Sequence, residues 1–187
     1  MSMIEMCEQH FAEVRVMVCD MGNGKLLSSL DVYSRHNHYF QNPTNPSRKV
    51  FIVPDVPHCL KNLRNHTLDD ELVIKKSDGN FVTLTKEHFS RLIERDSECG
   101  DFRLCYKLSK YHLDVKGSER QRVRTATELF SDTVSKAFLF YFPDDMKEQA
   151  DIITVVDDWF DVMNSRQKYS AKNKKCGLGR YFNFLND

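Results

Sequence analysis

Residues 50–65, Val50-Phe-Ile-Val-Pro-Asp-Val-Pro-His-Cys-Leu-Lys-Asn-Leu-Arg-Asn65, decide the fold of this chain. The apolar run over residues 49–53 predicts a short buried strand, and the pattern over residues 57–65 predicts the helix that follows it. Between them lies Asp55, at the carboxyl end of the strand, where open α/β sheets place their chemistry. Pro54 and Pro57 restrict the backbone on both sides of Asp55, which a plain turn would not require. We therefore expect a strand–helix unit that presents a functional carboxylate.

A second strand–helix unit precedes this stretch. Residues 14–19 are rich in strand-forming side chains and end at Asp20, and residues 26–30 suit a short helix. Residues 3–12 suit an opening helix, whereas residues 36–48 are rich in Asn and Pro and predict an irregular loop. Two such units in the first 65 residues predict the core of an α/β sheet, with two strands and helices.

Asp20 and Asp55 each follow a predicted strand, and each has two explanations. They could share a metal site, because hard divalent cations bind carboxylate oxygens. Alternatively, each carboxylate caps the element that follows it. The sequence Met-Gly-Asn-Gly after Asp20 favours the cap there, and for Asp55 we place the metal site first.

The second part of the chain has a different pattern. Residues 72–75 and 81–84 predict a hairpin around Asp78 and Gly79, and Thr85, with an acidic residue close behind it, predicts a helix start. Residues 118–140 give the strongest helical periodicity and predict one continuous helix, and another helix is expected over residues 144–163. The tail from residue 165 is polar and basic and predicts a solvated linker.

Composition limits the classes of protein to consider. A chain of 187 residues can form one domain, or one domain and part of another. Its 27 basic and 27 acidic residues balance, which argues against a globally basic nucleic-acid-binding protein. The 6 cysteines show no metal-binding spacing, and we expect them to be reduced. No long apolar run or signal-peptide pattern is present, so we expect no membrane contact and a nuclear or cytoplasmic location.

Several polar residues of the second part could bind a nucleotide. The glycine-rich phosphate-binding motifs G-x-x-x-x-G-K-[ST] and G-x-G-x-x-G do not occur in the sequence. Nucleotide binding would therefore depend on side chains of helices. Lys107, Arg122 and Ser131 could hold phosphates. Asp161 could accept hydrogen bonds from a guanine edge, with Asn164 three residues later and Phe160 as a stacking surface. From spacing alone, solvated charges and helix caps explain these residues more simply.

Five motifs, in this order, resemble those of P-element-type transposases, which include the THAP-type transposases of animals. The first two are Val-Cys-Asp20-Met-Gly and the stretch from Val53 to Asn65. The others are Tyr106-Lys-Leu-Ser-Lys-Tyr-His112, the run from Arg120 to Val134, and Asp158-Trp-Phe-Asp-Val-Met-Asn-Ser165. The resemblance extends from about residue 5 to residue 175, and ordered agreement of five motifs is more specific than any one of them.

The resemblance implies an RNase H-like catalytic domain interrupted by a mostly helical insertion that binds GTP. Residues 1–65 would form a partial RNase H-like core, residues 66–175 the GTP-binding insertion domain, and residues 176–187 the start of a return segment. Asp55 matches the second of three catalytic acids that hold Mg²⁺ for strand cleavage. The first acid would precede this chain and the third would follow it, so the resemblance implies no DNA cleavage. Asp20 belongs to a separate family motif.

The resemblance also assigns the nucleotide-binding residues. Lys107, Arg122 and Ser131 match positions near the GTP phosphates, where the second is usually lysine, and Val123 matches a position that lines the nucleotide. A guanine-recognition segment matches Phe160, Asp161 and Asn164. We expect GTP to bind with Mg²⁺ and not to be hydrolysed, because GTP serves this family in assembly with DNA.

The expected partners follow from the same family. They are GTP, transposon-end DNA, and a second copy of the chain or a full-length transposase. Two alternatives stay open. One is a remnant of an active DNA transposase with nuclease activity, and the other is a domesticated DNA-binding or protein-interaction module that binds no nucleotide.

Overall fold

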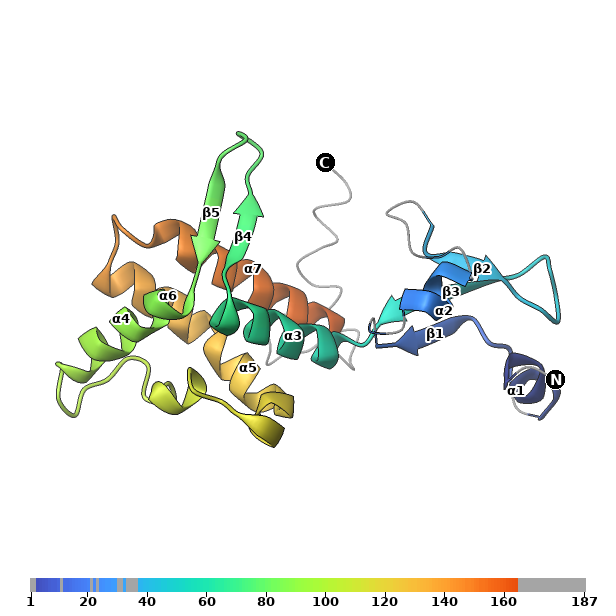
Figure 1. The fold of residues 1–187 in the computed structure, drawn as a ribbon, viewed down its shortest axis with the longest axis horizontal. Helices are drawn as coiled ribbons and strands as arrows, with labels where there is room; N and C mark the ends of the chain where they lie inside the picture. The colour runs from blue at the N-terminus through green and yellow to red at the C-terminus, as the bar shows by residue number, and fades with distance from the viewer. Residues whose placement is uncertain are drawn as a thin grey trace, which may run out of the picture. The chain divides into compact units, whose positions relative to one another are not determined.

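The computed structural model describes residues 3–10, 12–20, 22, 24–29, 32 and 37–164 (Figure 1). The predicted basic tail and the segment 176–187 lie outside these residues. The chain divides into an N-terminal unit, residues 1–59, and a C-terminal unit, residues 60–187. Helix α3, Val56–Asp69, begins in the first unit and runs without interruption past residue 65, where we placed the domain boundary.

A three-stranded mixed sheet forms the N-terminal unit. Strand β3 lies in the centre, pairs in parallel with β1, and pairs antiparallel with β2. Val50 of β3 is fully buried, which confirms that the stretch chosen from the sequence contains a core strand. The elements of this unit are α1 (Met3–His10), β1 (Val16–Cys19), α2 (Gly24–Ser29), β2 (Tyr39–Gln41) and β3 (Lys49–Pro54).

The prediction that residues 36–48 are entirely irregular is wrong, because β2 lies within them. Strand β2 has only 3 residues, too few for a recognisable alternation of side chains. Pairing with β3 stabilises it, and the Tyr39 ring lies 5.9 Å from the Phe51 ring of β3. A tertiary contact therefore specifies this strand, and the core has three strands instead of two.

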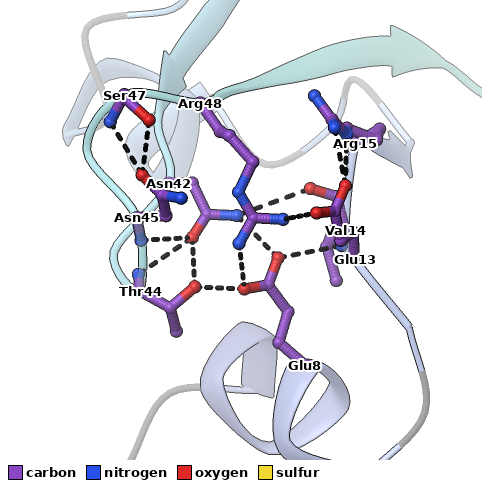
Figure 2. A network of polar contacts seen from close by, with 9 residues as sticks. All are labelled: Glu8, Glu13, Val14, Arg15, Asn42, Thr44, Asn45, Ser47 and Arg48. Atoms are coloured by element: carbon purple, nitrogen blue, oxygen red, sulfur yellow. Dashed lines mark hydrogen bonds and ion pairs between the residues drawn. The ribbon is translucent and has the colours of Figure 1, made fainter.

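Glu8 connects helix α1 to the turn between β2 and β3 (Figure 2). One carboxylate oxygen accepts hydrogen bonds from the Val14 N–H at 2.9 Å and the Asn42 amide at 2.8 Å. The other accepts from the Thr44 hydroxyl and from Arg48, at 2.8 Å. The Thr44 hydrogen bond in particular lowers the pKa of Glu8 from 4.5 to about 2. One carboxylate thus orders three separate segments of the unit.

The described part of the C-terminal unit contains most of α3, followed by two strands, four further α-helices and two short 3₁₀ helices. The predicted hairpin is present, with antiparallel strands around Gly79, whose φ of 88° favours glycine. Phe89 packs edge-to-face against Phe130 and Phe138 in the core. After α3 come β4 (Leu72–Lys75), β5 (Phe81–Leu84), α4 (Lys86–Ser97), η1 (Lys110–His112), η2 (Gly117–Gln121), α5 (Val123–Leu129), α6 (Asp132–Tyr141) and α7 (Lys147–Met163).

The prediction of one continuous helix over residues 118–140 is wrong. The structure divides this region into η2, α5 and α6. Phe130, with φ −98° and ψ 50°, leaves the helical conformation, and Ser131 then caps α6 by accepting a hydrogen bond from the Val134 N–H at 3.4 Å. The apolar periodicity continues across the break, because both helices bury their apolar faces in the same core.

Helices α6 and α7 pack against each other through a polar contact in addition to apolar side chains. The Ser135 hydroxyl donates to the carbonyl of Ala150 at 2.9 Å and lies 2.7 Å from the Thr154 hydroxyl. Gln149 of α7 donates to the Thr83 carbonyl of β5 at 3.1 Å. Among the helices of the described ranges, none has the length and apolar character needed to cross a membrane.

Candidate nucleotide site

A cavity of about 420 Å³ opens in the C-terminal unit, between the loop after α4, helix α5 and the start of α6. This volume is in the range of small-molecule sites. Its lining combines apolar, hydroxyl and charged side chains: Cys105, Tyr106, Lys107, Leu108, Arg124, Thr127, Glu128, Ser131, Thr133 and Val134. The predicted residues Lys107 and Ser131, 24 positions apart in the sequence, thus lie on one cavity.

The loop between α4 and η1 presents Lys107 to this cavity. Cys105 and Leu108 are buried, so the loop is fixed to the core on both sides of the exposed residues Tyr106 and Lys107. The Lys107 ammonium lies 5.6 Å from the centroid of the Tyr106 ring, within the range of a cation–π contact. A cation in this position can bind an anionic ligand in the cavity.

Ser131 lies where α6 begins. Its hydroxyl donates to the carbonyl of Glu128 at 3.1 Å and accepts from the Val134 N–H. Thr133 and Val134, in the first turn of α6, also line the cavity. Because the first turn of a helix carries a partial positive charge and unpaired N–H groups, this end of the cavity favours a phosphate.

Glu128 introduces a negative charge, and two neighbours interact with its carboxylate. Its carboxylate lies 3.0 Å from Arg124 and 2.9 Å from the buried His112. Burial disfavours the charged form of Glu128, but the hydrogen bonds from His112 and Arg124 outweigh it and lower the pKa of Glu128 below its usual value. The lining therefore carries an ionised carboxylate beside two cations, Arg124 and Lys107.

Arg122 and Val123 lie at the start of α5 and are not among the described residues that line the cavity. The Arg122 side chain is 64% exposed and forms an ion pair with Glu119 at 2.8 Å. Val123 is half-buried. These two residues directly precede Arg124 in the sequence, but the structure does not place them on the cavity wall.

The predicted guanine-recognition residues lie at the end of α7, and none of them lines the cavity in the described structure. Phe160 is only 9% exposed, so its ring packs inside the unit and presents little open surface for stacking. Asp161 is half-buried, and Asn164 ends the helix, with its N–H donating to the Phe160 carbonyl at 2.9 Å. Trp159, the single tryptophan of the chain, is half-buried on the same helix end.

Asp20 and Asp55 lie at one edge of the N-terminal sheet. The parallel register pairs Cys19 with Pro54, and each aspartate follows one of these residues. The Asp20 carboxylate accepts from the Gly22 N–H at 2.8 Å, which forms a local turn before α2. The described residues contain no group of three or more His, Cys, Asp or Glu side chains able to hold a metal ion. The sheet edge thus offers two carboxylates, and its geometry does not favour Asp55 over Asp20.

Sequence reasoning missed Tyr106, Arg124 and Glu128 among the cavity residues. Arg124 and Glu128 are four residues apart on α5, so they share one face of that helix, and Ser131 follows three residues later at the cap of α6. This spacing was the available signal. The spacing did not identify Arg124 and Glu128 as cavity residues, because charged side chains on a predicted helix are usually exposed to solvent.

Comparisons with known proteins agree with this architecture. A family model described as the TNP-like, GTP-binding insertion domain matches residues 57–176. The Drosophila melanogaster transposable element P transposase is 31% identical over 160 residues, which cover 82% of this chain and 20% of that protein. A solved structure of the Drosophila P element transposase strand transfer complex is 26% identical, with a TM-score of 0.84, and the match covers 98% of this chain and 42% of that one.

This chain therefore spans about a fifth of the length of the curated relative that it matches. The family model covers more than half of the chain, and the structural match includes both of its units. The chain belongs to the P-element-type transposase family and carries the TNP-like GTP-binding insertion domain of that family.

Proposed function

We propose that the C-terminal unit binds GTP, with the triphosphate in the cavity between the 105–108 loop and the start of α6. The observation that carries this proposal is the meeting of Lys107 and Ser131 on one cavity, within the region that matches a GTP-binding insertion domain. The cation, the hydroxyl and the N-terminus of α6 are three features that favour phosphate oxygens.

Arg124 and Arg122 would complete phosphate binding. Arg124 already lies on the cavity, paired with Glu128, and a phosphate would compete with this carboxylate for the guanidinium. Arg122 is exposed and forms a surface ion pair with Glu119, which is weak, so a change of side-chain conformation costs it little. In this proposal Val123 contacts the nucleotide beside them.

The base would be read at the end of α7. A carboxylate such as Asp161 can accept from both N1–H and the exocyclic amine of guanine, whereas adenine offers no matching pair of donors. Asn164 would add a further hydrogen bond, and Phe160 would contribute apolar contact from its buried position. The proposal therefore requires that GTP binds more tightly than ATP, and that Asp161 accounts for the difference.

Mg²⁺ would enter with the nucleotide. Magnesium is usually held by one or two carboxylates together with substrate phosphates, and it neutralises part of their charge when bound. The cavity fits this arrangement and not an all-protein cage, since Glu128 is the one carboxylate among its described lining residues. We propose binding without hydrolysis, in which GTP supports assembly.

Isothermal titration of the full chain with GTP and with ATP tests this function. We expect Lys107→Ala to weaken GTP binding by roughly tenfold or more, because a hydrogen bond to a charged group contributes about 1.5–3 kcal/mol. Lys110→Ala removes the same charge from an exposed position three residues away and serves as the control. Asp161→Asn should remove the preference for GTP over ATP.

Two results would contradict the proposal. One is a chain that binds neither nucleotide, which would favour a domesticated interaction module. The other is a preference for GTP that survives Asp161→Asn, which would move base recognition elsewhere.

The proposed setting of this activity is assembly with transposon-end DNA and with another transposase chain, in the nucleus or after synthesis in the cytoplasm. The solved relative is a strand transfer complex, which supports a role beside DNA. We propose no DNA cleavage by this chain, because its sheet edge offers only Asp20 and Asp55 among the described residues. Mg²⁺-dependent cleavage that is lost in Asp55→Ala or Asp20→Ala would reverse this conclusion.

A further inference from the structure

A buried carboxylate, Asp96, lies behind the loop that carries Lys107. It belongs to α4, and its side chain is 0% exposed. One carboxylate oxygen accepts from the Leu104 N–H at 2.7 Å and the Tyr141 hydroxyl at 3.1 Å. The Cys105 N–H lies 3.3 Å from both oxygens, and the Arg103 Nε–H donates to the second oxygen at 3.1 Å. A buried charge with this many donors is well compensated, and it fixes the atoms that surround it.

Arg103 connects Asp96 to the end of the loop at Leu108. While its Nε–H binds Asp96, its terminal nitrogen donates to the Leu108 carbonyl at 2.8 Å. The Leu108 N–H in turn donates to the Cys105 carbonyl at 2.8 Å. The backbone is therefore held at residues 104, 105 and 108, and the two residues left between these points are Tyr106 and Lys107.

A third contact holds the loop toward the opposite wall of the cavity. Burial raises the pKa of Cys105 to about 12, so its thiol stays protonated. The thiol lies 3.9 Å from the carbonyl of Thr133 in the first turn of α6. The loop that presents Lys107 is thus tied to α4 by Asp96 and to α6 by Cys105.

We infer that Asp96 is a positioning residue for the nucleotide site, which acts by holding the 103–108 loop so that Lys107 faces the cavity. This inference rests on the proposed GTP binding. Asp96 itself is fully buried and is not on the cavity wall, so its effect on a ligand must pass through the loop. A role in stability alone would lower the free energy of unfolding without a specific link to Lys107.

Asp96→Asn tests the inference, because the amide keeps the shape of the side chain but replaces one acceptor oxygen with a donor facing N–H groups. We expect GTP affinity to fall on the order of tenfold, as for other groups that orient a ligand-binding side chain. In a Lys107→Ala background, the same change should lower the affinity no further. Glu94→Gln, an exposed position on the same helix, removes an equal charge and should leave binding unchanged.

Hydrogen exchange provides a readout that needs no ligand. Asp96→Asn should accelerate exchange of the Leu104 and Cys105 amides while the amides of α7 keep their rates. If the variant does not fold, Arg103→Gln replaces it, since that side chain is 30% exposed and its loss releases the Leu108 carbonyl.

The outcomes separate this inference from the proposed function. Unchanged exchange at residues 104 and 105 in a folded variant would overturn it, and so would affinity losses that simply add to those of Lys107→Ala. If the wild-type chain binds no GTP, the proposed function fails, and the exchange rates alone decide whether Asp96 fixes the loop.

Discussion

Arg64 shows how much structure a single buried residue can fix. Its side chain is fully buried, and its guanidinium donates to the carbonyls of Arg120 and Arg122, to the Thr125 hydroxyl and to the Asn65 side chain. Burial lowers the pKa of Arg64 from its usual value, but an arginine remains protonated. The start of α5, which carries Arg122 and Arg124, depends on this planar group.

We expect Arg64→Lys to destabilise the C-terminal unit by about 1–3 kcal/mol, because lysine keeps the charge but cannot reproduce the fork of donors. Urea unfolding measures the change, and Arg91→Lys, at an exposed position of α4, is the matched control. Equal effects of the two substitutions would show that the Arg64 hydrogen bonds contribute little.

Glu8 gives the N-terminal unit a dependence on pH. Its folded pKa of about 2 lies below its usual value of 4.5, so the folded state favours the charged form. The stabilisation is complete above about pH 4.5 and is lost as the pH falls toward 2. We expect Glu8→Gln to reduce the acid dependence of unfolding, followed by NMR signals of β1 to β3. An unchanged dependence would place the acid sensitivity on another carboxylate.

At the scale of elements, the sequence predicted those whose signals are local. The Asp78–Gly79 turn specified the hairpin of β4 and β5 with the observed bounds, and the apolar run that ends before Asp55 specified β3. Strand β2 and the break at Phe130 were missed, because pairing with β3 and packing in the core decide them. The predicted cap at Thr85 is present, although His88 and not an acidic residue completes it.

The break between α5 and α6 depends on the cap at Ser131. We expect Ser131→Ala to cost about 0.5–2 kcal/mol of stability and Ser131→Asn to cost much less, since asparagine also caps helices well. Thermal unfolding followed by circular dichroism compares the two variants. A Ser131→Ala variant as stable as the wild type would mean that packing alone ends α5 and starts α6.

The candidate site was predicted less completely than the elements. Family resemblance identified Lys107 and Ser131, which share a cavity. Spacing could not show that Arg122 pairs with Glu119, that Phe160 is buried, or that Arg124 and Glu128 face the cavity. Side-chain direction depends on the packing of several elements, and a single sequence does not specify it.

For the whole molecule, the division into two units separates the expected effects of a ligand. A ligand at 100 times its dissociation constant stabilises its site by about 2.7 kcal/mol. We expect GTP to slow hydrogen exchange in the C-terminal unit and to leave residues 1–59 unchanged. ATP at the same concentration is the control. Equal protection of both units would show that they respond as one body.

The position of Trp159 has a practical consequence for such experiments. As the single tryptophan, it dominates the ultraviolet emission of the chain, and it lies next to Phe160 and Asp161 on the half-buried end of α7. Any rearrangement of this helix end changes the polarity around the indole. The native protein therefore contains its own optical reporter with which to test the proposed guanine recognition, and no fluorescent label has to be attached.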